Sequence, residues 1–159
     1  MAVFEKTIHY QKLNNETILD WLSDNRIFVN QYAVMLLNNL SFNSNRDNLQ
    51  IVITELSLAD LNLHGEANYL DISDAISNFG FKHCPFIRLS YKDQIRSSPV
   101  SMNKHPEDAI LIFSKPLVES VEFPKGFYII ERDGDLWLRG YVCSEDYTWS
   151  PDTRIIVCN

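Results

Sequence analysis

Residues 15–40 carry apolar side chains at the spacing of helices. Asn14 or Asn15 is a suitable N-cap for a short helix that ends at Leu22, where polar residues interrupt the pattern. The segment Ile27–Leu40 predicts a longer, well-buried helix, because it presents two adjacent apolar rows at i+4 spacing. The first of these rows consists of Phe28, Tyr32, Leu36 and Leu40.

Two further helical segments are predicted from their capping signals. Ser57 with Asp60 three residues later resembles a capping box, which predicts a helical turn that runs to Leu61. Asp71 is the expected cap of the next helix, and Gly80 stands where a left-handed stop belongs. The inner face of that helix is predicted to contain Ile72, Ala75, Ile76 and Phe79.

Short runs rich in apolar and β-branched residues predict strands, most of them after Gly80. They are Leu49–Thr54, Phe86–Tyr91, Ala109–Ser114, Phe127–Arg132, Asp135–Val142 and Arg154–Cys158. Helices therefore come first and strands later, which is typical of an α+β fold. We predict one domain over residues 1–159, in which N-terminal helices pack on one face of a mainly antiparallel sheet of about four to six strands.

Asp133-Gly134 is the strongest turn signal in the chain, because this dipeptide favours a two-residue hairpin. Such a turn pairs Arg132 with Asp135 and assigns alternate side chains to opposite faces. The face expected to meet the helices carries Phe127, Ile129, Leu136 and Leu138. The other face carries Tyr128, Ile130, Trp137, Arg139 and Tyr141, a composition typical of an interface.

The charge is acidic overall and unevenly distributed. There are 21 Asp and Glu against 14 Lys and Arg, so the net charge is -7, which disfavours binding to nucleic acid or to an anionic membrane. Residues 47–81 contain six Asp or Glu and no Lys or Arg, whereas residues 82–105 contain five Lys or Arg and one acid, Asp93. The two segments either neutralise each other in the fold or leave a basic face for an anionic ligand. No apolar run is long enough for a membrane span.

Cysteine and acidic residues give no signal for a metal or a cofactor. Cys84, Cys143 and Cys158 have no metal-ligand spacing, and their odd number predicts free thiols in a reducing compartment. Glu131, Asp133 and Asp135 straddle the predicted turn and are expected to be solvated. We expect no metal, no cofactor and a location in the bacterial cytoplasm, with a secreted effector as the alternative.

The segment from Cys84-Pro85 to Gln94 resembles a family of small bacterial proteins without an assigned activity. These proteins carry a Cys-Pro pair followed by Leu-Arg-Leu-x-Tyr-x-Asp-Gln, and residues 87–94 here read Ile-Arg-Leu-Ser-Tyr-Lys-Asp-Gln. A capped helix that ends in Gly precedes the pair, and a segment like Trp149-Ser150-Pro151-Asp152 follows. The resemblance covers Thr54 to Asn159 and implies a shared fold but no chemistry. It departs from the family in the shorter spacer after Pro85 and in the unmatched N-terminal part.

Two classes of function remain open. The first is a non-enzymatic binding or regulatory protein that contacts a protein partner, or a second copy of itself, through an aromatic sheet face. Its binding patch is predicted to contain Tyr128, Trp137, Arg139, Tyr141 and Trp149. The alternative is a small metal-independent hydrolase, a ribonuclease in which Arg88 and Lys92 bind phosphate and His105 transfers a proton. The acidic net charge counts against the ribonuclease.

Overall fold

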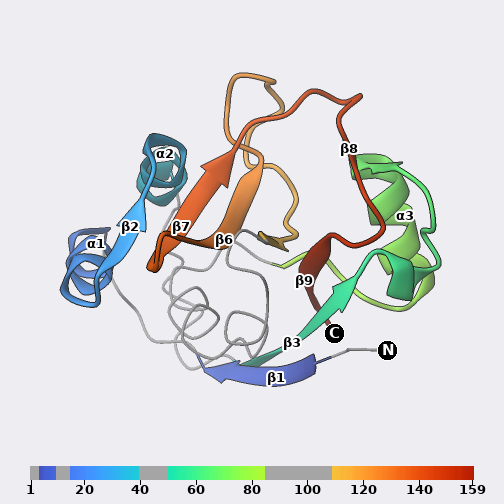
Figure 1. Cartoon of the computed structure of the whole chain (residues 1–159), viewed down its shortest axis with the longest axis horizontal. Helices are drawn as coiled ribbons and strands as arrows, with labels where there is room; N and C mark the ends of the chain where they lie inside the picture. Colours follow the sequence, from blue (N-terminus) through green and yellow to red (C-terminus); the bar gives the residue numbers. More distant parts are fainter. Residues whose placement is uncertain (1–3, 10–14, 40–49, 85–108) are drawn as a thin grey trace.

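The computed structural model describes residues 4–9, 15–39, 50–84 and 109–159, and these form a seven-stranded sheet flanked by helices. The strand order is β1-β3-β9-β5-β6-β7-β2 (Figure 1). Its strands are β1 (Phe4–His9), β2 (Ile27–Val29), β3 (Gln50–Ser57), β5 (Ile110–Ile112), β6 (Gly126–Arg132), β7 (Asp135–Tyr141) and β9 (Arg154–Cys158). The other elements are α1 (Asn15–Asp24), α2 (Gln31–Asn39), the 3-10 turn η2 (Ala59–Leu61), α3 (Tyr69–Asn78) and a ribbon of β4 (Ala67–Asn68) with β8 (Thr148–Trp149).

The sheet is mainly antiparallel, which confirms the predicted α+β class. Only the pairs β2–β7 and β5–β9 are parallel among the described strands. The sheet has more strands than predicted, because the sequence pattern did not show β1 or β2.

The helices lie at opposite ends of the sheet (Figure 1), and they belong to core clusters on its two opposite faces. Leu22 of α1 and Leu36 of α2 share one core cluster with Phe127 and Leu138, as the predicted face of the hairpin requires. Ile72 of α3 instead belongs to a second cluster on the other face. The prediction of helices on one face was therefore incomplete. β5 and β9 are buried along their whole length, and strands that are buried on both sides need cover on both.

The predicted helix Ile27–Leu40 is wrong at its start. Its first three residues form β2, which pairs in parallel with β7, and the helix begins only at Gln31. Asn30 lies between the two elements and is the N-cap of α2. Its Oδ1 atom accepts a hydrogen bond of 2.8 Å from the Ala33 amide. The same side chain bonds both the amide and the carbonyl of Gly140, at 2.9 and 3.0 Å. Asn30 therefore joins α2 to β7.

The capping of α3 also differs from the prediction in one residue. Asn68 is the N-cap, and Asp71 is its capping-box partner three residues later. Ile72, Ala75 and Ile76 are buried as predicted, whereas Phe79 is 47% exposed. The left-handed stop at Gly80 is confirmed by its φ of 83°.

The two other turns that were predicted from capping and turn residues are present in the structure. Ser57 and Asp60 bond each other's backbone amides, at 2.9 and 3.2 Å, and η2 follows. In the hairpin, Asp133 and Gly134 have φ values of 52° and 82°, and Arg132 pairs with Asp135 as predicted. The predicted strand Phe86–Tyr91 lies outside the described residues.

Candidate functional site

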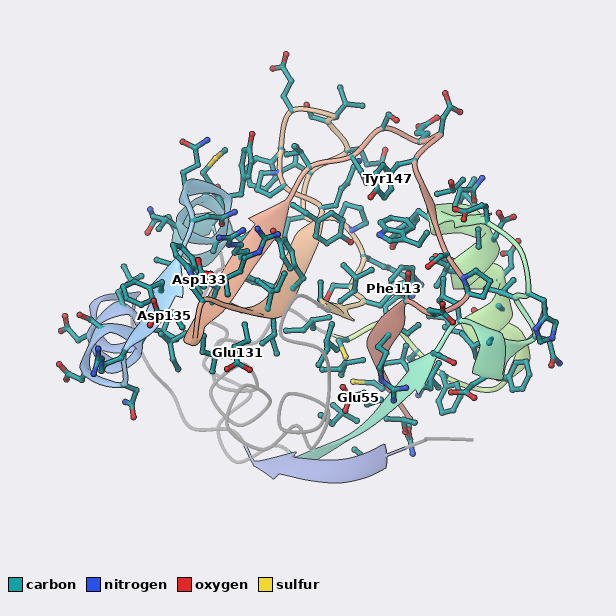
Figure 2. The ribbon with its side chains drawn as sticks, in the orientation of Figure 1. Glu55, Phe113, Glu131, Asp133, Asp135 and Tyr147 are labelled. Carbon is teal, nitrogen blue, oxygen red and sulfur yellow. The ribbon has the colours of Figure 1, made fainter. Side chains whose placement is uncertain are left out.

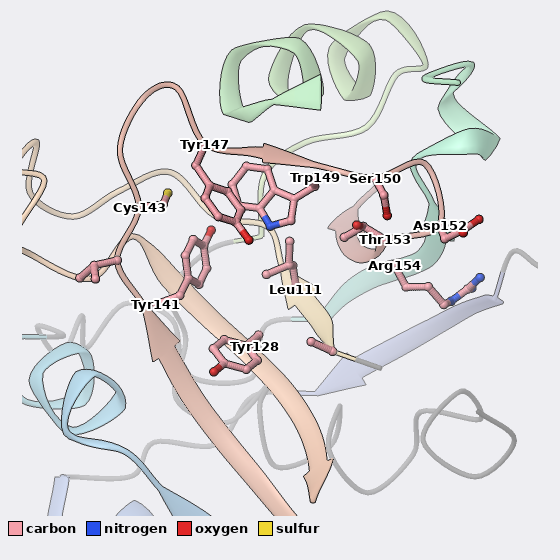
Figure 3. A pocket seen from close by; sticks show the side chains of 12 residues that line it. Leu111, Tyr128, Tyr141, Cys143, Tyr147, Trp149, Ser150, Asp152, Thr153 and Arg154 are labelled. Carbon is pink, nitrogen blue, oxygen red and sulfur yellow. The ribbon is translucent and has the colours of Figure 1, made fainter. Parts of the chain in front are cut away.

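A cavity of about 430 Å³ lies on the sheet face that also carries α3 (Figure 3). Its lining comes from β5, from the ends of β6 and β7, and from the connection that runs through β8 to β9. The lining includes Tyr128, Tyr141 and Trp149 of the predicted binding patch. Leu111, Cys143 and Tyr147 add to its apolar part. Three of the five predicted patch residues therefore surround one hollow.

Aromatic rings form a continuous wall around this cavity. The ring centroids of Tyr128 and Tyr141 are 6.3 Å apart, and those of Tyr141 and Trp149 are 6.2 Å apart in an edge-to-face arrangement. Tyr147 contacts Trp149 at 4.9 Å, also edge to face. Such pairs favour fixed ring positions. The wall is therefore a defined surface against which another flat apolar group can pack.

The Tyr141 hydroxyl has an unusual environment. The residue is half-buried, but its hydroxyl oxygen is fully buried and has no hydrogen-bond partner among the described residues. Burial raises the pKa of Tyr141 well above its ordinary value, so the group is neutral and able to donate. Gly126 leaves room for the Tyr141 ring, because a Cβ atom there would lie 3.3 Å from it, a tight contact.

The opposite end of the cavity is polar. It is lined by Ser150, Asp152, Thr153 and the buried Arg154. Backbone hydrogen bonds of 3.0 Å hold this wall in place, from the Leu58 amide to the Thr153 carbonyl and from the Ala59 amide to the Pro151 carbonyl. The cavity is thus open to a ligand with an apolar part and a polar part.

Trp137 and Arg139, the other two patch residues, lie on the same face but do not line the cavity. The Arg139 guanidinium stacks over the Trp137 ring at 4.4 Å from its centroid. Trp137 also contacts Phe28 of β2, with ring centroids 5.1 Å apart. The predicted patch is therefore divided into a cavity group and an edge cluster of Phe28, Trp137 and Arg139. Phe28 was predicted to lie in a helix, so its position beside Trp137 did not follow from the sequence pattern.

A second polar cluster joins α3 to the segment before residue 85. The Ser73 hydroxyl and His83 Nε2 share a hydrogen bond of 3.0 Å, and the His83 ring stacks on Phe113 at 5.2 Å. Burial and the nearby Lys115 lower the pKa of His83, so the imidazole is neutral near pH 7. His83 belongs to the α3 side of the sheet, whereas the next residue, Cys84, belongs to the other core cluster. As expected from an extended backbone, the two side chains diverge.

The other residues that the sequence analysis considered for catalysis, metal binding or membrane insertion can be located only within the described part of the chain. Arg88, Lys92 and His105 of the alternative catalytic set lie outside it. Within it, no group of three or more His, Cys, Asp or Glu is placed to hold a metal ion. Glu131, Asp133 and Asp135 lie around the tip of the β6–β7 hairpin (Figure 2). Among the described helices, none has the length and hydropathy needed to cross a membrane.

Comparison of the chain with protein-family models, with curated proteins and with solved structures found no match. The family resemblance described above stays a prediction, and the motif after Cys84 that carries it falls on residues outside the described ranges.

Proposed function

We propose that this protein is a non-enzymatic binding protein whose aromatic cavity receives an apolar side chain of a protein partner. One observation carries the proposal: Tyr128, Tyr141 and Trp149, selected from sequence as an interface, line the same 430 Å³ cavity. Cavities of a few hundred Å³ with apolar walls and a few polar groups are typical of binding sites. Tyr and Trp are also the residues that most often anchor interfaces.

The surroundings of the cavity favour a protein partner over a free small molecule. Tyr147 lines the cavity and is 51% exposed. The loop that leads into β6 exposes Leu117, Val118 and Val121. This loop ends where the Lys125 amide donates a 2.7 Å hydrogen bond to the carbonyl of Tyr141. Tyr147 therefore exposes aromatic surface at the cavity itself, and the loop before β6 adds exposed apolar side chains to the molecular surface, which suits a protein partner better than water.

The same considerations extend to location and to the alternative function. Three cysteines held as thiols suit a reducing compartment, and we place the protein in the bacterial cytoplasm. The ribonuclease hypothesis rests on Arg88, Lys92 and His105, for which the described residues add no supporting observation. A homodimer through the aromatic face is a further form of the binding hypothesis.

The first test uses small probes that mimic aromatic side chains. Indole and p-cresol are titrated into the labelled protein, and amide and methyl resonances are followed by NMR. We expect Leu111 and Tyr147 to shift together, whereas signals of Phe28 at the edge cluster stay unchanged. Absence of any shift at Leu111 up to millimolar probe would remove the cavity from the proposal.

The second test compares matched variants in capture from bacterial lysate. Trp149→Ala and Tyr147→Ala alter the cavity, and Trp137→Ala alters the edge cluster. We expect a partner that wild type and Trp137→Ala retain and that both cavity variants lose by at least about tenfold, the loss of one interface anchor. Equal retention by all variants would overturn the proposal. Light scattering decides whether a second copy of the chain is the partner.

A further inference from the structure

Two buried thiols face each other in the core cluster that also contains Leu22 of α1 and Leu36 of α2. The Sγ atoms of Cys84 and Cys158 are 3.6 Å apart, and the Cys158 thiol donates to the Cys84 sulfur. Both residues belong to the same core cluster, with exposed fractions of 3% and 6%. Cys143, by contrast, lines the aromatic cavity on the other face.

The backbone holds both cysteines firmly. Lys82 and Cys158 exchange two amide-to-carbonyl hydrogen bonds of 2.7 and 2.8 Å across a β-bridge. The Cys84 amide donates a 2.7 Å hydrogen bond to the Phe113 carbonyl. Residue 84 and the end of β9 are therefore fixed side by side, although they lie 74 residues apart in sequence.

We propose that Cys84 and Cys158 form a redox-active dithiol, which closes to an intramolecular disulfide when the protein meets a peroxide. A disulfide has a sulfur–sulfur distance of about 2.05 Å, so the two sulfurs need to approach by roughly 1.5 Å. At 3.6 Å the two sulfurs are already in van der Waals contact, and we expect rotation about the Cα–Cβ bonds to contribute to their approach. Neither the aromatic cavity nor its proposed partner enters this inference.

The reaction balances with one peroxide and two thiols. The Cys158 thiolate attacks one oxygen of hydrogen peroxide, the O–O bond breaks, and hydroxide leaves, so that a sulfenic acid forms on Cys158. The Cys84 sulfur then attacks the Cys158 sulfur and forms the S–S bond. Hydroxide leaves as the S–O bond breaks, and the protons of the two thiols convert both hydroxides to water. The dithiol gives up two electrons in total, and the peroxide accepts them.

The local charges favour Cys158 as the first nucleophile. The hydrogen bond shared with Cys84 and the positive charge of Lys82 lower the pKa of the Cys158 thiol, and burial of the thiol acts in the opposite direction. The hydrogen bond with Cys158 and complete burial raise the pKa of Cys84. Burial also raises the pKa of Cys143, which makes it a suitable control.

The experiment oxidises the folded full-length chain and counts thiols. Reduced protein, freed of reductant, is treated with a small excess of hydrogen peroxide, quenched, and alkylated in denaturant. We expect three alkylated cysteines before treatment and one afterwards, with a mass lower by about 2 Da before alkylation. A non-reducing peptide map is expected to link Cys84 to Cys158, and dithiothreitol is expected to restore all three thiols.

Matched variants identify the pair. Cys143→Ser is expected to change from two thiols to none, whereas Cys158→Ser is expected to retain both of its thiols without a link. If Cys158→Ser does not fold, the peptide map of the wild type alone decides. Three thiols remaining after peroxide treatment, a link that includes Cys143, or a link between two chains would each overturn the proposal.

Discussion

Gly140 is a position where one missing side chain sets the distance between two elements. A Cβ atom there would lie 2.7 Å from the carbonyl carbon of Tyr32 and 2.8 Å from the amide nitrogen of Ala33. These are backbone atoms, which cannot rotate away. The absence of a side chain at Gly140 therefore lets α2 approach β7 closely.

We expect Gly140→Ala to destabilise the protein by about 1–3 kcal/mol, because α2 has to move away from β7. Gly65→Ala is the matched control, since a Cβ atom at Gly65 would meet no atom within 4 Å. Its free energy of unfolding is expected to stay within about 0.5 kcal/mol of wild type. Urea unfolding of both variants tests the expectation, and equal midpoints would contradict it.

Leu138 and Arg139 are neighbours in sequence with opposite environments. Leu138 is fully buried in the core below α2, so Leu138→Ala is expected to cost about 2–5 kcal/mol. Arg139 is half-buried and stacks on Trp137, so Arg139→Ala is expected to cost only about 0.5–1 kcal/mol. Urea melts compare the two. A larger loss for Arg139→Ala would show that its side chain is part of the core.

At the scale of elements, Asn30 is the residue that connects a helix to the sheet. Asn30→Ala removes the N-cap of α2 and both hydrogen bonds to Gly140, and we expect a loss of roughly 2–3 kcal/mol. Asn39→Ala, at the other end of α2, removes only an exposed bond to the Met35 carbonyl. Its effect is expected to stay below about 0.5 kcal/mol. Thermal unfolding of both variants measures these losses. A loss for Asn30→Ala as small as that for Asn39→Ala would show that Asn30 does not join α2 to β7.

The same junction shows where sequence reasoning reached its limit. The hairpin register was predictable because Asp133-Gly134 fixes its pairing within a few residues. Ile27–Val29 carried helical periodicity, yet these residues pair with β7. The Asn30 bonds span 110 residues of sequence. Contacts over so long a sequence separation override local periodicity. The local sign of β2 was Asn30, which follows three residues with high β-propensity.

The candidate site was predictable in part for a related reason. Alternation in β6 and β7 placed Tyr128 and Tyr141 on the correct face. The cavity itself is closed by the connection between β7 and β9, whose path depends on hydrogen bonds to Leu58 and Ala59. No period in residues 142–153 indicates that path. Trp137 was assigned to the same patch because strand pairing shows which side chains share a face, but not how far along that face the cavity extends.

At the scale of the whole molecule, the charge of -7 predicts weak interaction with nucleic acid. We expect no cleavage of single-stranded RNA and no binding at physiological salt. Gel analysis of a labelled RNA and fluorescence anisotropy measure the two. Cleavage that disappears in His105→Ala would instead support the ribonuclease alternative.

The order in which the strands are synthesised has a consequence for how this protein is made. β9 lies between β3 and β5, and every one of its residues is buried. Until Cys158 has left the ribosome, β3 and β5 each present an open edge of unpaired amide and carbonyl groups, and such edges promote aggregation. The sheet can therefore close only after β9 has been translated, and we expect chains truncated before Arg154 to aggregate more readily than the whole chain.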